Sequence, residues 1–219
     1  VIDTFEKDGV KYEFKYPEDA FSIKDKLGDV MANEEKVVKY LDIPIQHCND
    51  EILKRMNRKS NKKALLELFK KLRERLPDVT LRTTLITGFP GETEEDFEDT
   101  LDVVSKVNFE QVFMFIYSVR KGTRAEKMDG HIPEEIKSRR FNRLKELADK
   151  ITEEENYKYI DTIQKVLVEG ESKTNKDVLT GRTSSNKVVN FVGDKNLIGK
   201  EINVKIGDSV KAGDVLFSV

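Results

Sequence analysis

Residues 81–96, LRTTLITGFPGETEED, combine residue types suited to binding a flat or phosphate-bearing ligand. Leu81, Thr83 and Leu85 alternate with Arg82, Thr84 and Ile86, the period of a strand with two distinct faces. Arg82 and Thr84 make one of these faces polar and cationic. Three residues that break a strand and bring backbone close to a ligand follow it: Gly88, Pro90 and Gly91. Such a turn is where α/β folds bind ligands, although an ordinary strand–helix turn explains the pattern equally well.

Metal-ligating and nucleophilic side chains are scarce in this chain, which has one cysteine, Cys48, and two histidines, His47 and His131. A single cysteine excludes an intrachain disulfide and cannot hold a metal cluster unaided. Two histidines are too few for a convincing zinc site. We therefore expect no metal site and no catalytic cysteine, with His47 in a structural role.

Length and charge set broad limits on the protein. Its 219 residues can form one sizeable core, or one core and a small second module. The formal net charge is −2, with basic residues concentrated in 54–75 and acidic ones in 92–102, as on the solvated faces of surface helices. Neither a membrane-spanning apolar run nor a signal peptide is evident. We expect a cytoplasmic protein with no membrane partner.

Strands and helices alternate through the first three-quarters of the chain. The strand expected at 111–117 is apolar throughout, which favours burial on both faces. Four strand–helix pairs at this spacing predict parallel strands, and so part of a barrel or an open parallel sheet. Thr93 and Asp96 have the spacing of a capping box, and Asn49 or Asp50 can cap an earlier helix. The expected strands are 10–14, 37–46, 81–87 and 111–117, and the expected helices include 21–33, 61–76 and 133–157.

After residue 161 the texture changes to five short β-rich runs separated by Gly, Asn and Asp. Five strands in about sixty residues predict a small β-barrel. The boundary falls near 160, giving an α/β unit at 1–160 and an all-β unit at 161–219. Loops of the second unit carry basic and amide side chains but few aromatic ones, which suits contact with a phosphate backbone. A plain solubilising surface explains them equally well.

Three motifs, in this order and at these intervals, resemble the C-terminal half of the barrel of radical S-adenosylmethionine methylthiotransferases. They are DIPIQHCNDEILKRMNR (42–58), LRTTLITGFPGETEEDF (81–97) and FIYSVRKGTRAEKM (115–128). LTGRTSSNKVVNF (179–191) resembles the family's terminal TRAM domain, a small β-barrel that holds the RNA or protein substrate. KYEFKYPED (11–19) resembles the third barrel strand more weakly. The resemblance implies an α/β fold: a partial parallel (βα) barrel followed by a TRAM barrel.

The resemblance also implies cofactors and site residues. The family inserts a methylthio group, with one [4Fe-4S] cluster cleaving S-adenosylmethionine and a second cluster supplying sulfur. The positions carried over for S-adenosylmethionine are Gln46, Arg82, Thr84, Gly88, Phe89, Pro90, Gly91, Glu92, Tyr117 and Ser118. Gln46 would point into the barrel mouth, and Tyr117 and Ser118 would lie near the adenine. For three of them a structural role stays open: a strand end (Gln46), a core aromatic (Tyr117) and a helix start (Glu92).

The expected substrate-binding residues are Arg120, Lys173, Arg182, Asn186 and Lys187. QHCND and LRTT resemble members that modify an aspartate of a small-subunit ribosomal protein, whereas FIYS and LTGRT…NKVVNF resemble members that modify an adenosine beside the tRNA anticodon. We favour tRNA, because the terminal module grips the substrate and Arg182 with Lys187 suits phosphate contact. A stand-alone RNA-binding module without catalysis is the other alternative.

Two departures from the family limit these expectations. The CxxxCxxC loop of the radical cluster and the cysteine-bearing N-terminal domain have no counterpart here, and iron–sulfur clusters need several thiolates. We therefore expect a fragment, inactive alone and lacking the N-terminal cluster-binding region. The tail at 204–216 resembles a hairpin of biotinyl or lipoyl carrier domains, and we interpret it as a plain strand–turn–strand.

Overall fold

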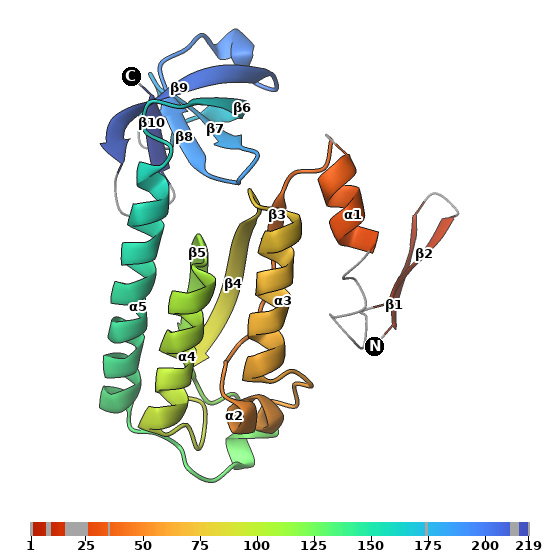
Figure 1. Ribbon diagram of the computed structural model, residues 1–219, viewed down its shortest axis with the longest axis vertical. Coiled ribbons are helices and arrows are strands. Elements are labelled where there is room, and N and C mark those ends of the chain that lie inside the picture. Colours follow the sequence, from red (N-terminus) through yellow and green to blue (C-terminus); the bar gives the residue numbers. More distant parts are fainter. Residues whose placement is uncertain are drawn as a thin grey trace.

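The computed structural model describes residues 2–7, 10–15, 26–34, 36–173, 175–210 and 215–218, with side chains for 28–34, 36–173 and 175–207. Two β structures adjoin one long helix, α5 (Glu134–Tyr157): the first lies along its side and the second lies at its carboxyl end (Figure 1). The first is a parallel sheet with helices on one face, and the second is a small closed barrel. The fold is α/β, part of a parallel (βα) barrel followed by a small β-barrel.

The parallel sheet has three strands in the order β3 (Tyr40–Asp42), β4 (Thr80–Thr87) and β5 (Gln111–Ile116). The strand expected at 37–46 is shorter than predicted, because regular pairing ends at Asp42. The chain then meets β4 again through a single bridge between Gln46 and Leu85. The carboxyl ends of all three strands meet at the edge farthest from the small barrel (Figure 1).

The first of the four expected parallel strands does not join this sheet. Residues 10–14 lie in β2 (Val10–Lys15), which pairs antiparallel with β1 (Ile2–Lys7). The prediction was wrong here because an alternating pattern reports a strand but not its partner. The described residues of α1 (Lys26–Asn33) match the end of the helix expected at 21–33, and its first residues lie outside the described part.

Side-chain caps begin three of the helices, and two of these caps, those at Asn49 and at Thr93, were predicted from the sequence. Asn49 accepts amides at the start of α2 (Asp50–Arg55), and Asn61 does so for α3 (Lys62–Arg75). The capping box of Thr93 and Asp96 opens α4 (Glu94–Val107) with both reciprocal hydrogen bonds. Such caps satisfy amides that have no partner inside the helix. A proline at the N-cap, Pro133, precedes α5.

In the described part of the chain, only one face of the sheet is covered. Leu81, Thr83 and Leu85 of β4 are buried toward the helices, with the main apolar core. On the opposite face, Phe113 and Phe115 of β5 are 45% and 54% exposed. The prediction that this strand is buried on both faces was therefore wrong. A continuous apolar run is typical of strands in parallel sheets. Whether both faces of such a strand are buried depends on which elements cover the sheet, and the run itself does not show this.

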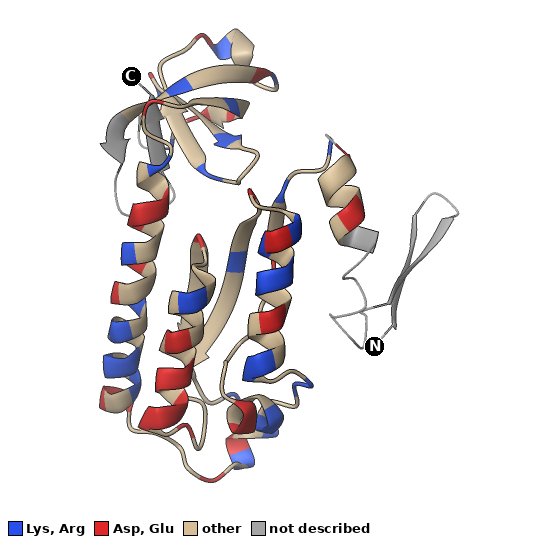
Figure 2. Cartoon of the chain, in the orientation of Figure 1, with Lys and Arg blue, Asp and Glu red and all other residues tan. Residues whose placement is uncertain are grey.

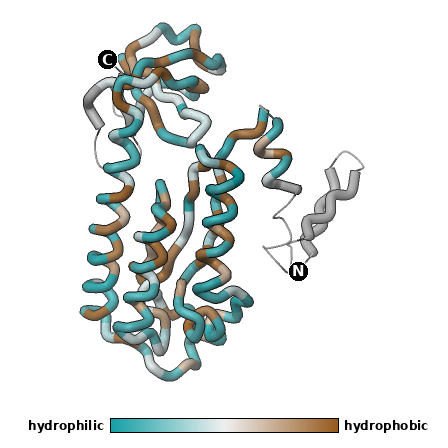
Figure 3. The backbone as a smooth tube through the Cα atoms, in the orientation of Figure 1, coloured by the Kyte–Doolittle hydropathy of each residue, from teal (hydrophilic) through white to brown (hydrophobic). Residues whose placement is uncertain are grey.

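Ion pairs join the two neighbouring helices α4 and α5. Figure 2 shows acidic residues along the start of α4 facing basic ones on α5. Glu94 accepts from Arg140 at 3.1 Å and Arg143 at 2.5 Å. Desolvation would raise the pKa of Glu94, but the hydrogen bond from Arg140 and the nearby arginine charges outweigh it and lower this pKa. Hydrophobic residues alternate with hydrophilic ones along α5 (Figure 3), which lets the helix pack on β5 with its other side in water.

The small barrel closes in the strand order β10-β8-β7-β6-β9, which confirms the five expected strands. Its apolar core includes Val166, Val168 and Val189. Gly181 is needed where β7 crosses β6, because a Cβ there would lie 2.5 Å from the carbonyl oxygen of Leu167. The strands are β6 (Ile163–Glu171), β7 (Leu179–Thr183), β8 (Val188–Phe191), β9 (Glu201–Val210) and β10 (Val215–Ser218).

The strand–turn–strand expected in the tail corresponds to β9 and β10, which pair antiparallel, with residues 211–214 outside the described part. The chain passes from α5 into β6 through residues 158–162. With 24 residues and a rise of 1.5 Å each, α5 is about 36 Å long. Among the described residues, no helix is both long and apolar enough to cross a bilayer.

Candidate functional site

The turn after β4 is held in a fixed shape by its own backbone. Gly88 and Gly91 have φ of +78° and +86°, a region that side-chain-bearing residues rarely adopt. A Cβ at Gly88 would lie 2.5 Å from Cδ of Lys137 and closer still to Cγ. The Gly91 amide donates to the Gly130 carbonyl oxygen at 2.8 Å. The glycine that was expected to let a ligand approach is therefore packed against a lysine of α5.

Glu92 binds this turn from within. Its carboxylate accepts the amides of Gly88 at 2.7 Å and Phe89 at 3.3 Å, and it is fully buried. Arg140 of α5, also buried, donates to Oε1 of Glu92 at 2.9 Å and to its carbonyl oxygen at 3.0 Å. A buried charge is tolerated when it is paired and hydrogen-bonded, as it is here. Glu92 thus acts on the turn and not on the helix start, which Thr93 caps.

His47 completes the same network. Its Nδ1 accepts the Asn49 amide at 3.0 Å, so that in the neutral ring the proton lies on Nε2. Nε2 faces Oε2 of Glu92 at 3.4 Å, and the imidazole is buried. The structural role predicted for His47 agrees with this placement.

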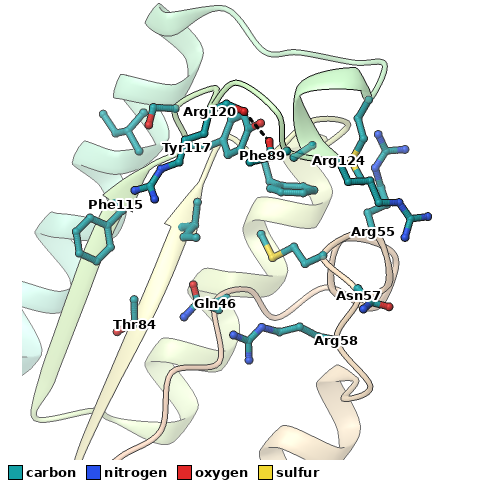
Figure 4. A pocket seen from close by; sticks show the side chains of 17 residues that line it. Gln46, Arg55, Asn57, Arg58, Thr84, Phe89, Phe115, Tyr117, Arg120 and Arg124 are labelled. Atoms are coloured by element: carbon teal, nitrogen blue, oxygen red, sulfur yellow. Dashed lines mark hydrogen bonds between the residues drawn. The ribbon is translucent and has the colours of Figure 1, made fainter. Parts of the chain in front are cut away.

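A cavity of about 750 Å³ opens at the carboxyl ends of the strands, on the uncovered face of the sheet (Figure 4). It has an apolar and aromatic wall from β4, β5 and the turn, and a polar rim from the segment after α2 and the loop after β5. No lining residue in the described part of the chain is acidic. The lining residues are Gln46, Arg55, Met56, Asn57, Arg58, Thr84, Ile86, Phe89, Phe115, Ile116, Tyr117, Ser118, Arg120, Thr123, Arg124, Ala125 and Met128.

The structure brings half of the expected cofactor residues together in this cavity. They are Gln46, Thr84, Phe89, Tyr117 and Ser118. Gly88, Pro90, Gly91 and Glu92 instead shape the turn that forms one wall. Arg82 lies toward the opposite end of β4, where it binds Asp42 at 3.1 Å and lies over the ring of Phe113. Arg82 therefore does not reach the cavity, because its strand position is too early.

The aromatic wall carries an unsatisfied polar atom. Phe89 and Tyr117 meet edge to face, with ring centroids 5.2 Å apart. The Tyr117 hydroxyl is buried and has no hydrogen-bond partner among the described residues. Buried hydroxyls normally find a partner, so this one suits a polar ligand in the cavity. S-adenosylmethionine fits such a site, because its flat adenine can pack on aromatic rings while its polar atoms meet Gln46, Thr84 and Tyr117.

The residues present do not fit an iron–sulfur cluster. Cys48 is fully buried, and desolvation raises the pKa of its thiol. Across the described residues no group of three or more His, Cys, Asp or Glu side chains could hold a metal ion. Clusters require several thiolates, so this part of the chain supplies no ligand set for one.

The expected substrate-binding residues fall into two distant groups. Arg120 lines the cavity, whereas Lys173, Arg182 and Asn186 belong to the small barrel at the other end of α5. Arg182 is engaged locally, by Glu169 at 3.2 Å and by Oδ1 of Asn186 at 3.1 Å. Lys173 is exposed.

The expectation of a surface position for Lys187 was wrong. Its relative exposure is 0%, and its amide donates to Oγ1 of Thr183 at 3.1 Å, within the turn between β7 and β8. An ammonium enclosed in this way cannot reach a phosphate. The sequence suggested otherwise because lysine is almost never fully buried.

Several cavity residues were not singled out from the sequence. Arg58 and Arg124 line the polar rim, and Ile86 and Phe115 line the wall. A signal was available, since Arg58 closes the motif at 42–58 and Arg124 lies within the motif at 115–128. The alternation of Arg82, Thr84 and Ile86 also placed Ile86 on the polar face.

Comparison with known proteins identifies two domains. The Radical SAM superfamily matches residues 17–104, and the TRAM domain matches residues 158–212. Among solved structures, coproporphyrinogen III oxidase from Escherichia coli, a radical SAM enzyme, is 15% identical with a TM-score of 0.46, over 73% of this chain and 43% of that chain.

Three curated relatives carry the name tRNA-2-methylthio-N(6)-dimethylallyladenosine synthase. The protein of Alkaliphilus oremlandii is 44% identical over 94% of this chain and 42% of its own length. Those of Acetivibrio thermocellus and Fusobacterium nucleatum are both 47% identical, over 90% and 91% of this chain and 40% and 45% of their own lengths. The chain spans less than half the length of these relatives. It belongs to the radical S-adenosylmethionine methylthiotransferase family.

Proposed function

We propose that this chain is the part of a tRNA methylthiotransferase that binds S-adenosylmethionine and the substrate. The reaction would add a methylthio group to an adenosine next to the anticodon, which is what the names of the relatives describe for those proteins. The boundary between the two units lies near residue 160, where α5 gives way to β6. Iron–sulfur ligands come from outside these residues, and the chain alone is expected to be inactive.

One observation carries this proposal: the cavity at the carboxyl ends of the parallel strands collects Gln46, Thr84, Phe89, Tyr117 and Ser118 from three separate segments. Ligands bind at this edge in α/β folds, because loops after successive strands converge there. The open face of the sheet, with Phe115 half-exposed, leaves room for a ligand above β4 and β5.

The roles of the side chains follow from their chemistry. Phe89 and Tyr117 present an apolar wall to the adenine, and the Tyr117 hydroxyl donates to or accepts from a polar atom of the ligand. Gln46 and Thr84 supply further hydrogen bonds from the floor. When bound, S-adenosylmethionine supplies the methyl group and the reactive fragment of the family's reaction. The residues of this chain orient it and exclude water on one side.

The small barrel supports the choice of RNA as substrate. It matches the TRAM domain, and basic side chains such as Lys173 and Lys176 are exposed on its loops. Exposed lysines near a nucleic acid contribute through phosphate contacts, which are independent of sequence. Arg182 contributes less than expected, because Glu169 already neutralises it.

A direct test is calorimetric titration of the chain with S-adenosylmethionine, with Thr84→Phe as the blocking variant. Thr84 lies on the open face and lines the cavity, so a phenyl group there fills the site without entering the core. We expect weak binding by the wild-type chain and at least a tenfold loss in the variant, because the loss of a few contacts exceeds 1.4 kcal/mol.

Ser105→Phe is the matched control, since Ser105 is exposed on α4 and far from the lining residues. It should bind as the wild-type chain does. Absence of binding by the wild-type chain at millimolar ligand, or equal binding by Thr84→Phe, would contradict the assignment of this cavity to the cofactor.

A further inference from the structure

Three arginines border the cavity from two sides. Arg58 follows α2, whereas Arg120 and Arg124 belong to the loop after β5. Figure 4 shows Arg58 extending toward Gln46 on one side, with Arg120 near Tyr117 and Phe115 on another. We call Arg58, Arg120 and Arg124 the arginine rim. No acidic residue lines this cavity within the described chain, so the rim gives its mouth a positive charge.

These charges are not neutralised by close ion pairs in the described part of the structure. Arg58 donates to the carbonyl oxygen of Pro44 at 3.1 Å, and desolvation lowers the pKa of its guanidinium with no carboxylate to offset it. Arg120 and Arg124 are exposed. Arg124 also borders an adjoining hollow, which is lined by the acidic residues Glu51 and Asp129. Arg58 and Arg120 line the main cavity and not this hollow.

A fourth lining arginine, Arg55, serves a structural purpose and lies outside the rim. Its guanidinium donates to the carbonyl oxygen of Asp129 at 2.9 Å. It also packs against the turn, since a Cβ at Gly91 would lie 2.9 Å from its Cζ. Arg58 shares one feature with Arg55, a hydrogen bond to a backbone carbonyl oxygen, that of Pro44 at 3.1 Å.

The chemistry of the rim fits a phosphodiester backbone. A guanidinium presents a planar fork of donors that matches phosphate oxygens in a bidentate manner. Next to the rim, the rings of Phe89, Phe115 and Tyr117 form the apolar wall. In the proposed function this wall faces the adenine of S-adenosylmethionine, so the guanidinium groups beside it are the part of the site that would contact the RNA backbone.

We propose that the arginine rim binds backbone phosphates of the substrate RNA beside the cavity, as a second RNA contact separate from the small barrel. The inference rests on the proposed function: if S-adenosylmethionine occupies the cavity, the reacting nucleotide must approach it at this mouth. The cavity and the barrel lie at opposite ends of α5, about 36 Å apart by its length. An oligonucleotide too short to span this distance cannot contact both places. The two contacts together therefore favour binding of a folded anticodon stem and loop.

The experiment measures tRNA binding by fluorescence anisotropy over a range of salt concentrations. The variants are Arg120→Ala/Arg124→Ala and, separately, Arg58→Ala. The control, Lys36→Ala/Lys71→Ala, also removes two positive charges, from exposed positions that do not line the cavity. We expect the double rim variant to weaken binding about tenfold or more. The slope of log K against log salt should fall by about 1.4 to 1.8, at about 0.7 to 0.9 per lost phosphate contact.

The rim could bind either an RNA phosphate or the carboxylate of S-adenosylmethionine. To separate the two, the affinities for S-adenosylmethionine and for 5′-methylthioadenosine, which lacks the carboxylate, are measured for each variant. We expect the rim variants to leave both of these affinities unchanged. If Arg58→Ala weakens only S-adenosylmethionine and leaves tRNA affinity intact, the rim serves the cofactor carboxylate and the inference fails. If the wild-type chain binds tRNA and the double rim variant matches the lysine control, the inference alone fails. If the wild-type chain binds no tRNA, the inference and the proposed substrate fail together.

Discussion

Replacing Glu92 with alanine should lower the free energy of unfolding by about 3 to 5 kcal/mol, the cost of removing one partner of a buried ion pair. Two amides, of Gly88 and Phe89, would lose their acceptor. The guanidinium of Arg140 would lose its buried counter-charge and keep Glu94, at 3.1 Å, and the backbone carbonyl oxygen of residue 92, at 3.0 Å. Unpaired buried groups carry the full cost of their desolvation, which makes this effect larger than that of a surface ion pair.

Urea unfolding followed by circular dichroism measures this cost, and Glu98→Ala is the matched control. Glu98 also pairs with an arginine of α5, Arg143, but at an exposed site, so its loss should cost less than about 1 kcal/mol. Glu92→Gln should fall between them, because an amide oxygen can still accept from the turn. Equal stability of Glu92→Ala and Glu98→Ala would contradict the role given to Glu92.

Gly88→Ala should be the second most damaging change, for two separable reasons. A left-handed backbone costs a residue with a Cβ about 1 to 2 kcal/mol, and φ at Gly88 is +78°. The new methyl group would also overlap the buried stem of Lys137, at about 1 to 3 kcal/mol. Lys137 cannot easily move aside, since its Nζ donates to the carbonyl oxygen of Tyr117 at 3.1 Å and pairs with Glu134 at 2.6 Å.

A double-mutant cycle with Lys137→Ala separates the two causes. In the Lys137→Ala background the methyl group has space, so the cost of Gly88→Ala should fall to that of the backbone alone. The same urea experiment measures all four proteins. An unchanged cost of Gly88→Ala in that background would show that Lys137 does not determine the need for glycine.

These two effects give the glycine turn a structural meaning. Gly88 leaves space for the side chain of Lys137, and Glu92 accepts the amides of the turn. The side chains of Lys137 and Glu92 are therefore both engaged by the protein and do not contact a ligand. The ligand-facing groups come instead from strand ends: Gln46, Thr84 and Tyr117. A loss of cofactor binding in Gly88 variants would therefore report a collapsed wall, which is why the test of the cavity uses Thr84→Phe.

Local features of the fold could be predicted from the sequence. The capping box of Thr93 and Asp96 and the alternation along β4 depend on residues a few positions apart, and both are confirmed. The five strands of the small barrel are confirmed as well. They could be predicted because Gly, Asn and Asp mark the turns between them. Family motifs added the location of Gln46 and Tyr117, which no local pattern distinguishes from ordinary strand ends.

Features that depend on distant contacts could not be predicted. Arg140 lies 48 residues after Glu92, and nothing in either segment indicates that they pair. The exposure of Phe113 and Phe115 depends on the absence of a covering layer in the described chain, which an apolar run cannot show. The burial of Lys187 runs against the ordinary preference of lysine. The arginine rim likewise unites residues about sixty positions apart in the sequence.

The most direct test of substrate and site together is titration of the wild-type chain with tRNA and, in parallel, with the small-subunit ribosomal protein. Phosphate contacts release counterions, so binding to tRNA should weaken steeply as salt rises. We predict saturable, salt-dependent binding of tRNA and none of the ribosomal protein at the same concentrations. Tight binding of the ribosomal protein with no response to tRNA, or a flat salt dependence, would contradict the account.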